Sequence, residues 1–466
     1  MESFGWWSLI PTLCVLIIAF STRRTLESLL AGAVIGFIIL EKQNFFPAMV
    51  DSLLATMGDP TVGWITLIIV FFGGFIALLV KSGGALAFGN YVAARIKSKK
   101  GALLATWIMG LIIFIDDYLN ALVLGTAMQR VTDKYRISRE YLAYIIHSTA
   151  APVCVIVPIS TWAVFVSGIF EKNGVVAEGL GGAAYIQTIP LILYGWVAIL
   201  VVVLSIFGII PKLGQMKKAE LRAETTGICI PESKKNMHDE VAATSEDTFN
   251  GDSAGISKNI EKPRMINFII PIAVLIFYTW FSGIDLLQGI IVAVLVTIAM
   301  LFVQRLMGLR ELFDTFIEGT KPMIYIVMMF VASFMLVEAN DQLGVTTFVI
   351  EQVKPLMNAE FLPVVAFISL SLVAFATGAI WGIYAITLPI IIPLAQAVGA
   401  DLWLSVGAVI SAGAFGSHLC PYGDSTLICA TASGIEPMTH TLTQMPYVIL
   451  SGLITAVFYV VLGFVM

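Results

Sequence analysis

The sequence carries little charge. Of its 466 residues, 12% are Asp, Glu, Lys or Arg and 58% are apolar, whereas a soluble domain has roughly 25% charged residues. The mean hydropathy is +0.93. One membrane-spanning helix needs about 20 apolar residues, and stretches of this kind recur from Trp6 to Met466. The composition excludes an ordinary soluble domain and predicts an all-α polytopic membrane protein.

Sequence motifs typical of enzymes and nucleotide-binding proteins are also missing. The five cysteines have no CxxC spacing, and no GxxxxGK[ST] run is present. His147, His418 and His440 have no spacing typical of metal ligands or of a nucleophilic site. The first ten residues lack the basic n-region of a cleavable signal. We therefore expect no enzyme, no ATP-driven pump, no cofactor and no nucleic-acid partner.

The apolar stretches form two blocks, residues 1–210 and 265–466, and a polar linker at 211–264 separates them. The linker is rich in Lys, Glu, Ser and Asn, so we expect it to be flexible. The order of segments in the first block recurs in the second at an offset of about 256–267 residues. Weak internal symmetry of this kind is typical of transporters built from inverted repeats.

Each block contains two interrupted apolar segments. Segment 101–130 is broken at its middle by acids, and segment 361–398 is broken at Thr377-Gly378, so we predict two re-entrant hairpins. Segments 141–170 and 404–434 are predicted to be broken spans. In the first block we expect continuous spans at 6–20, 25–40, 61–80 and 187–210, and an interfacial segment at 83–96. Each repeat then has five membrane crossings, including one broken helix, plus one hairpin.

The distribution of positive charge orients the chain. With both termini outside and 211–264 in the cytoplasm, only Lys42, Lys172 and Lys354 of the 26 basic residues lie outside. Cytoplasmic loops carry an excess of Lys and Arg. The predicted location is therefore the inner (plasma) membrane, in contact with lipid.

Polar residues at the interruptions are the candidates for binding a cation. An uncompensated carboxylate at the bilayer centre costs at least about 2.5 kcal/mol, and the first hairpin tip holds two in succession. Oxygen ligands suit Na⁺, which we expect as the coupling ion. The candidate ligands are Asp116, Asp117, Asn120, Ser148, Thr149, Asp424 and Ser425. Which of Asp116 and Asp117 binds the ion stays open.

A second set of residues suits a small-molecule substrate. An imidazole can bind a polar group or carry a proton, aromatic rings can cover apolar parts, and glycine lets backbone approach a ligand. These candidates are His147, Ser148, Thr149, Thr377, Gly378, Trp381, Tyr384, Ser417 and His418. Each hydroxyl and each aromatic residue also has a purely structural explanation, as a bond back to a helix carbonyl or as packing.

Four runs carry a family resemblance: DDYLNALVLG, STAAPVCVIVPISTW, PYGDST and HTLTQMPY. They resemble the signatures of the NhaC family of Na⁺/H⁺ antiporters, within the wider ion transporter superfamily, and the resemblance covers the chain outside the linker. It implies inverted repeats, an elevator-type movement and a homodimer. Relatives often have an acid where this chain has His147, and this difference leaves room for an organic substrate.

The sequence therefore predicts a secondary active transporter, with Na⁺/H⁺ antiport as its activity. The alternative within this class is Na⁺- or H⁺-coupled transport or exchange of an amino acid or organic acid. An ion channel is the alternative from another class, but channels place their filter on an oligomer axis rather than between broken helices of one chain.

Overall fold

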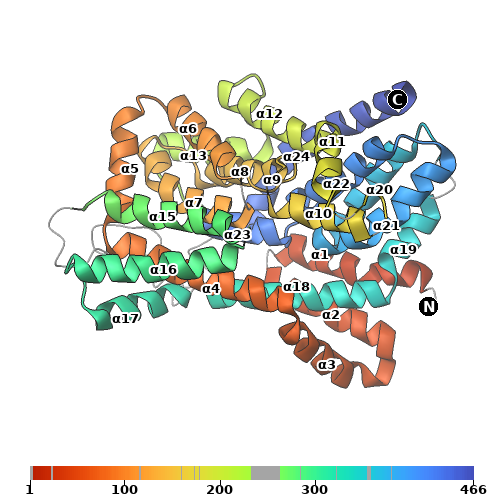
Figure 1. Cartoon of the computed structure of the whole chain (residues 1–466), viewed down its shortest axis with the longest axis horizontal. Coiled ribbons are helices and arrows are strands. Elements are labelled where there is room, and N and C mark those ends of the chain that lie inside the picture. The colour runs from red at the N-terminus through yellow and green to blue at the C-terminus, as the bar shows by residue number, and fades with distance from the viewer. Residues whose placement is uncertain are drawn as a thin grey trace.

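The structure is a computed structural model. It describes residues 4–22, 25–114, 117–158, 160–172, 174–177, 179–231, 263–283, 285–321, 323–353, 358–378 and 380–466. Within these ranges every regular element is a helix (Figure 1). The predicted all-α class is confirmed.

Up to the linker, the described residues of the first block form α and 3₁₀ helices. They are η1 (Gly5–Leu9), α1 (Ile10–Thr22), α2 (Thr25–Glu41), η2 (Lys42–Asn44), α3 (Phe45–Gly58), α4 (Pro60–Lys81), α5 (Gly84–Arg95), α6 (Lys99–Ile112), α7 (Asp117–Lys134), α8 (Arg139–Thr149), α9 (Ala151–Cys154), α10 (Thr161–Lys172), α11 (Gly181–Thr188) and η3 (Ile189–Leu191), followed by α12 (Leu193–Phe207). The linker begins with α13 (Gly214–Thr226).

The second block follows a similar order. Its helices are α15 (Ile266–Phe281), α16 (Leu286–Val303), α17 (Leu309–Thr320), α18 (Met323–Gln342), α19 (Val345–Val353), α20 (Leu362–Thr377), α21 (Ile380–Val398), α22 (Leu402–Leu419), α23 (Asp424–Ser433) and α24 (Pro437–Val465).

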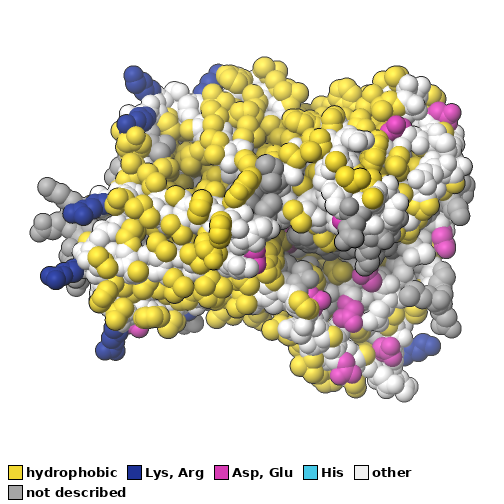
Figure 2. All heavy atoms as spheres, viewed as in Figure 1, with side chains coloured by type: hydrophobic (Ala, Val, Ile, Leu, Met, Phe, Trp, Pro, Cys, Tyr) yellow, Lys and Arg dark blue, Asp and Glu magenta, His cyan; other side chains and the backbone are white. Residues whose placement is uncertain are grey.

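Several helices are suited to a bilayer. Among the described residues, five are long and apolar enough to cross a membrane: Leu26–Gly58, Val62–Lys81, Leu286–Val303, Leu402–Leu419 and Pro437–Val465. A bent pair, Gly181–Leu191 with Leu193–Phe207, would make a sixth. Large apolar side chains face outward on these helices, as the broad hydrophobic surface in Figure 2 shows. The protein is thus a polytopic membrane protein by composition and helix length, while ten crossings stay a prediction.

The helices are interrupted at the positions that the sequence predicts. Helix α6 ends before the consecutive acids Asp116 and Asp117, and α7 begins at Asp117. Helix α20 ends at Thr377 because Gly378 takes a left-handed conformation (φ +72°), which glycine adopts without a steric penalty. The first broken span divides into α8, α9 and α10, and the second into α22 and α23.

Two predictions about the chain are wrong: that span 187–210 is continuous, and that the whole linker is flexible. Span 187–210 is not continuous: the chain bends by 49° between Leu191 and Leu193. Pro190 lies in the short η3 element at this bend, and proline cannot donate the backbone hydrogen bond that a continuing helix requires.

The linker is not flexible throughout. Its first part forms α13, which packs on α8 and α24. Met216, Ala219 and Ala223 are buried on one side of this helix, and the polar composition concealed that narrow apolar stripe. Residues 232–262 lie outside the described part of the chain, so the prediction stands untested there.

Helices of the two blocks pack against each other. Helix α2 packs on α18 while α16 packs on α4, and α3 packs on α18 while α17 packs on α4. In the other half of the molecule, α6 packs on α8 while α20 packs on α22. Helices α7 and α23, which begin at interruptions, lie against each other in the interior.

Charge is unevenly distributed over the two ends of the molecule. In the face shown in Figure 2, the Lys and Arg side chains gather at the end occupied by α5 and α17, and most of the visible Asp and Glu side chains gather toward the opposite end. Figure 1 places both chain termini at that opposite end.

Candidate functional site

Two carboxylates meet where α7 and α23 begin. Asp117 is the first residue of α7, and Asp424 is the first residue of α23. The Asp117 side chain is only 2% exposed. The two groups are close enough to repel each other electrostatically. A helix N-terminus stabilises negative charge and so offsets part of the cost of burying the two carboxylates.

Each acid is bonded by the residue that follows the other acid. The Ser425 hydroxyl donates to Asp117 Oδ2 at 2.6 Å, and the Tyr118 hydroxyl donates to Asp424 Oδ2 at 2.7 Å. The backbone N–H of Ser425 also donates to Asp424 Oδ1 at 2.7 Å. Helices from the two blocks are therefore joined through their acids.

An aromatic wall covers Asp117 on its other side. Trp162 Nε1 donates to Asp117 Oδ1 at 3.2 Å, and the Trp162 ring meets the Tyr384 ring edge-on, with centroids 5.6 Å apart. The Tyr384 hydroxyl donates to the carbonyl of Ile410. A Cβ at Gly413 would lie 2.4 Å from the Tyr384 ring, so only glycine lets α22 approach it this closely. Tyr384 thus packs on the ring that donates to Asp117.

Asn120 connects the interruption between α6 and α7 to the end of α8. Its amide nitrogen donates to the carbonyls of Gly110 (2.7 Å), Ile113 (2.8 Å) and Thr149 (3.0 Å). These carbonyls are left over where α6 and α8 end. Asn120 Oδ1 is buried without a hydrogen-bond partner among the described residues, so it is free to bind a cation.

The interruption between α22 and α23 is stabilised internally. Thr426 Oγ1 donates to the carbonyl of Cys420 at 2.7 Å. In the first broken span, Ser160 Oγ donates to the carbonyl of Cys154 at 2.6 Å. Both bonds link a hydroxyl to the carbonyl six residues earlier, so the two interruptions share this hydrogen bond.

Three histidines form a second buried cluster. His147 Nδ1 lies 3.0 Å from His440 Nε2, and the ring centroids of His147 and His418 are 4.2 Å apart. The Tyr194 hydroxyl lies 2.8 Å from His418 Nδ1, and Gln444 Oε1 lies 3.2 Å from His147 Nδ1. We call the three imidazoles the histidine cluster.

The remaining candidate residues are placed as follows. The Thr149 hydroxyl bonds back to the carbonyls of its own helix, and Ser148 Oγ lies 3.5 Å from His418 Nε2, so neither hydroxyl contacts Asp117. Thr377 likewise donates to the carbonyl of Val373. Asp116 lies outside the described residues.

Three candidates near the second hairpin remain. Gly378 lies beside Tyr422, whose hydroxyl donates to the carbonyl of Ala376. Ser417 Oγ is buried without a hydrogen-bond partner among the described residues. Trp381 is part of α21, but its side chain is not described.

Sequence reasoning missed five residues of this region. They are Tyr118, Trp162, Tyr194, His440 and Gln444. Four of them lie within the family-like runs or one residue beyond a quoted acid, which is a usable signal. Tyr194 has no such signal, because it reaches the cluster only through the packing of α12.

The arrangement suits a monovalent ion and protons better than a transition metal. No group of three or more His, Cys, Asp and Glu side chains among the described residues is arranged to hold a metal ion. Carboxylates and imidazoles inside an apolar helical bundle, at interrupted helices, are typical of ion-coupled secondary transporters.

Comparison with known proteins agrees with this class. The model of the Na⁺/H⁺ antiporter family matches residues 173–464, more than half of the chain. The chain belongs to the Na⁺/H⁺ antiporter family, a family of transporters rather than enzymes, and the resemblance seen in the sequence is confirmed.

Three individual relatives have low sequence identity to this chain or match only a short part of it. A Haemophilus influenzae protein described as uncharacterized is 26% identical over 98% of this chain and 91% of its own length. A Bacillus subtilis malate-2H(+)/Na(+)-lactate antiporter is 31% identical, over 20% of each chain. A Haemophilus influenzae protein described as an uncharacterized Na(+)/H(+) antiporter is 29% identical, over 23% of each chain.

Proposed function

We propose that this protein exchanges Na⁺ for H⁺ across the plasma membrane, and that Asp117 and Asp424 are the groups at which the two ions compete. The observation that carries the proposal is the reciprocal bonding of the two acids by Ser425 and Tyr118. It joins two interior carboxylates from different blocks into one site.

Competition for the same oxygens produces exchange. Two carboxylates in an apolar interior require a compensating positive charge. Na⁺ supplies it by binding the carboxylate oxygens together with neutral oxygens such as Asn120 Oδ1 and Ser425 Oγ. Protons supply it by neutralising the acids. Since one occupant excludes the other, a gradient of either ion drives the other in the opposite direction.

The finer architecture belongs to the same proposal. We infer that residues 1–210 and 265–466 are inverted repeats of the NhaC type, and that the site moves across the bilayer in an elevator-type movement within a homodimer. The paired packing of α2 on α18 and α16 on α4 supports the repeats. So does the equivalence of the Cys154–Ser160 and Cys420–Thr426 bonds.

A second candidate is proton- or Na⁺-coupled exchange of a small organic acid. The Bacillus subtilis relative is named a malate-2H(+)/Na(+)-lactate antiporter. In this chain the histidine cluster provides hydrogen-bonding groups that a bare Na⁺ site does not use. The short match keeps this candidate second.

Neutralising one acid tests the proposal. The Asp117→Asn variant keeps the size of the side chain but removes its charge, so Na⁺-dependent proton movement in proteoliposomes should fall at least about 100-fold, as for the loss of an essential buried charge. The matched control is Asp401→Asn at the N-cap of α22, where Asn caps as well as Asp does. D401N should transport like the wild type.

The same assay separates the two candidates. Exchange in vesicles containing only Na⁺, H⁺ and an impermeant buffer supports cation antiport. Exchange that starts only after malate or lactate is added supports the organic-acid function. Full activity in both Asp117→Asn and Asp424→Asn would remove the carboxylate pair from the mechanism.

A further inference from the structure

The exchange proposed at Asp117 and Asp424 gives the histidine cluster no role. The sequence contains four histidines, and three of them, His147, His418 and His440, come from α8, α22 and α24 to meet in the interior. Each is at most 1% exposed. Because apolar packing would fill this space at lower free-energy cost than three imidazoles, a binding function deserves a specific argument.

Hydrogen bonds fix where the protons of the cluster reside. Gln444 Nε2 donates to the carbonyl of His418 at 2.7 Å, so Gln444 Oε1 faces His147 Nδ1 as an acceptor. A proton on His147 Nδ1 satisfies both Gln444 Oε1 and His440 Nε2. The opposite tautomer would leave two acceptors facing each other.

That assignment leaves two reactive positions. His147 Nε2 then carries a lone pair, and His440 Nδ1 carries a hydrogen, and both atoms are buried without a hydrogen-bond partner among the described residues. Burial disfavours the imidazolium form, so a lone pair of this kind accepts a proton only when water or a rearrangement stabilises the charge. The geometry therefore provides an unused base at His147.

The surroundings of the cluster are polar but mostly neutral. The titratable groups that face it are Tyr194 from α12 and Tyr144, which bonds to Ser148 on α8. Tyr447 of α24 stacks on Tyr144. The nearest charged residue on α24 is Glu436 at its N-cap, whose carbonyl accepts from the N–H of His440. On α8 it is Glu140.

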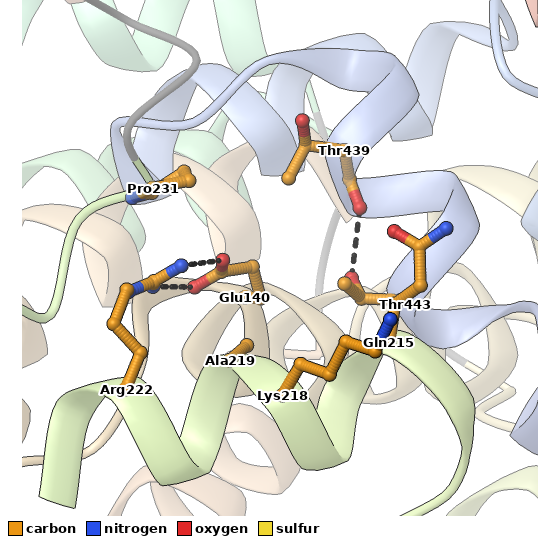
Figure 3. A pocket seen from close by; sticks show the side chains of 8 residues that line it. All are labelled: Glu140, Gln215, Lys218, Ala219, Arg222, Pro231, Thr439 and Thr443. Carbon is orange, nitrogen blue, oxygen red and sulfur yellow. Dashed lines mark hydrogen bonds and ion pairs between the residues drawn. The ribbon is translucent and has the colours of Figure 1, made fainter. Parts of the chain in front are cut away.

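A cavity reaches the same turn of α24 (Figure 3). Its volume is about 410 Å³, and Thr439 and Thr443, which bracket His440, line it. Thr443 Oγ1 donates to the carbonyls of Thr439 (2.9 Å) and His440 (2.8 Å). The opposite wall holds Glu140, paired with Arg222 of α13 through two bonds of 3.0 and 2.9 Å.

Helix geometry relates the cavity to the cluster. Glu140 precedes His147 by seven residues on α8, about 10 Å along the helix axis. The cavity is thus separated from His147 by about two helical turns of α8, and the α24 residues that line it, Thr439 and Thr443, lie beside His440 on that helix. A small separation of α8 from α24 would let water in the cavity reach both imidazoles.

We propose that the histidine cluster is a second proton-binding site of this protein, distinct from the carboxylate pair and filled from the cavity of Figure 3. The proposal rests on the proposed antiport. One proton from cavity water binds His147 Nε2, and the resulting imidazolium keeps its Nδ1–H bonds. Because a buried positive charge is costly, protonation favours the arrangement in which α8 and α24 admit water.

Proton release upon Na⁺ binding tests this proposal. The double variant H147N/H440Q keeps the contact, since the Asn amide N–H replaces Nδ1–H and the Gln amide oxygen replaces Nε2, but neither side chain can bind a proton. In purified full-length protein, Na⁺ binding should persist, while the protons released per bound Na⁺ near pH 7 fall to less than about half of the wild-type value. The matched control H238Q changes the fourth histidine, outside the described residues, and should match the wild type.

The possible outcomes are distinct. Undiminished proton release by H147N/H440Q overturns the second site and leaves the carboxylate proposal intact. If the wild type releases no protons on binding Na⁺, the antiport proposal itself fails.

A measurement on the unmodified protein covers the case in which the double variant does not fold. Exchange of the imidazole C2 hydrogen, followed residue by residue by mass spectrometry, should show His147 or His440 titrating between about pH 5 and 8, with a midpoint that moves when Na⁺ is added. If neither histidine titrates in this range, the cluster is structural.

Discussion

At the scale of single residues, Ser425 and Tyr118 decide how the acids behave. Each donates a hydroxyl hydrogen bond to the acid on the opposite helix. Such a bond to a carboxylate stabilises its charged form. It therefore weakens proton binding and lets Na⁺ compete at a lower concentration.

Removing one donor should shift this competition. Ser425→Ala deprives Asp117 of its shortest bond, and a bond to a charged group contributes about 1.5–3 kcal/mol. The Na⁺ concentration for half-maximal exchange should rise about 10- to 100-fold, most strongly at acidic pH, where protons compete best. Flux assays in proteoliposomes at two pH values measure this.

Ser433 provides the control for that variant. It is buried on the same helix, α23, and its hydroxyl has no hydrogen-bond partner among the described residues. Ser433→Ala should leave the Na⁺ dependence unchanged. Equal behaviour of the two alanine variants would show that the Ser425 bond does not tune the site.

At the scale of elements, α13 holds the start of α8. Glu220 of α13 accepts from both the N–H and the hydroxyl of Ser138, the N-cap of α8, at 2.8 Å each. Lys99, at the start of α6, pairs with Glu220 at 2.7 Å. One linker helix therefore fixes the ends of α6 and α8, the two helices whose interruptions form the candidate site.

Lys212, just before α13, makes this region sensitive to pH. Burial lowers the pKa of Lys212 from 10.5 to about 8, although its ammonium lies 3.3 Å from the centre of the Tyr141 ring. Between these two values the unfolded chain binds a proton that the folded protein has released. Stability therefore increases as the pH rises from about 8 to 10.5.

Replacing Lys212 should remove that contribution. In Lys212→Met, the midpoint of thermal unfolding should be a few degrees higher than in the wild type at pH 7, and the difference should shrink by pH 10. The exposed Lys217→Met is the control and should follow the wild type. Scanning fluorimetry of the purified protein gives both curves, and a difference independent of pH would rule out titration of Lys212 as the cause.

At the scale of the whole molecule, the sequence predicts where helices are interrupted better than where they are continuous. Acids, Thr377-Gly378 and proline-containing runs mark the breaks because such residues disrupt a buried helix wherever it packs. The bend at Pro190 and the docking of α13 were missed, since hydropathy cannot distinguish a bent span or a narrow apolar stripe. Asp117, Asp424 and Ser425 could be singled out by their chemistry, but Tyr194 joins the region only through tertiary packing.

The orientation of the whole molecule can be tested through its charge. Basic residues favour the cytoplasm, and Figure 2 shows the visible Lys and Arg side chains mostly at one end. We predict that this end is cytoplasmic. In a variant without native cysteines, a cysteine replacing the exposed Lys42 should react with a membrane-impermeant maleimide in intact cells.

The linker supplies the matching position. A cysteine replacing Ser245, outside the described residues, should react only after the membrane is permeabilised. Both variants have the same background and are treated with the same reagent. For each variant, the ratio of labelling before and after permeabilisation therefore reports which side of the membrane the cysteine faces, independently of its intrinsic reactivity. Efficient labelling at position 245 in intact cells, with protection at position 42, would show that the molecule has the opposite orientation in the membrane. The cavity of Figure 3, which lies beside α13, would then open to the outside, and the proton reaching the histidine cluster would come from the external solution.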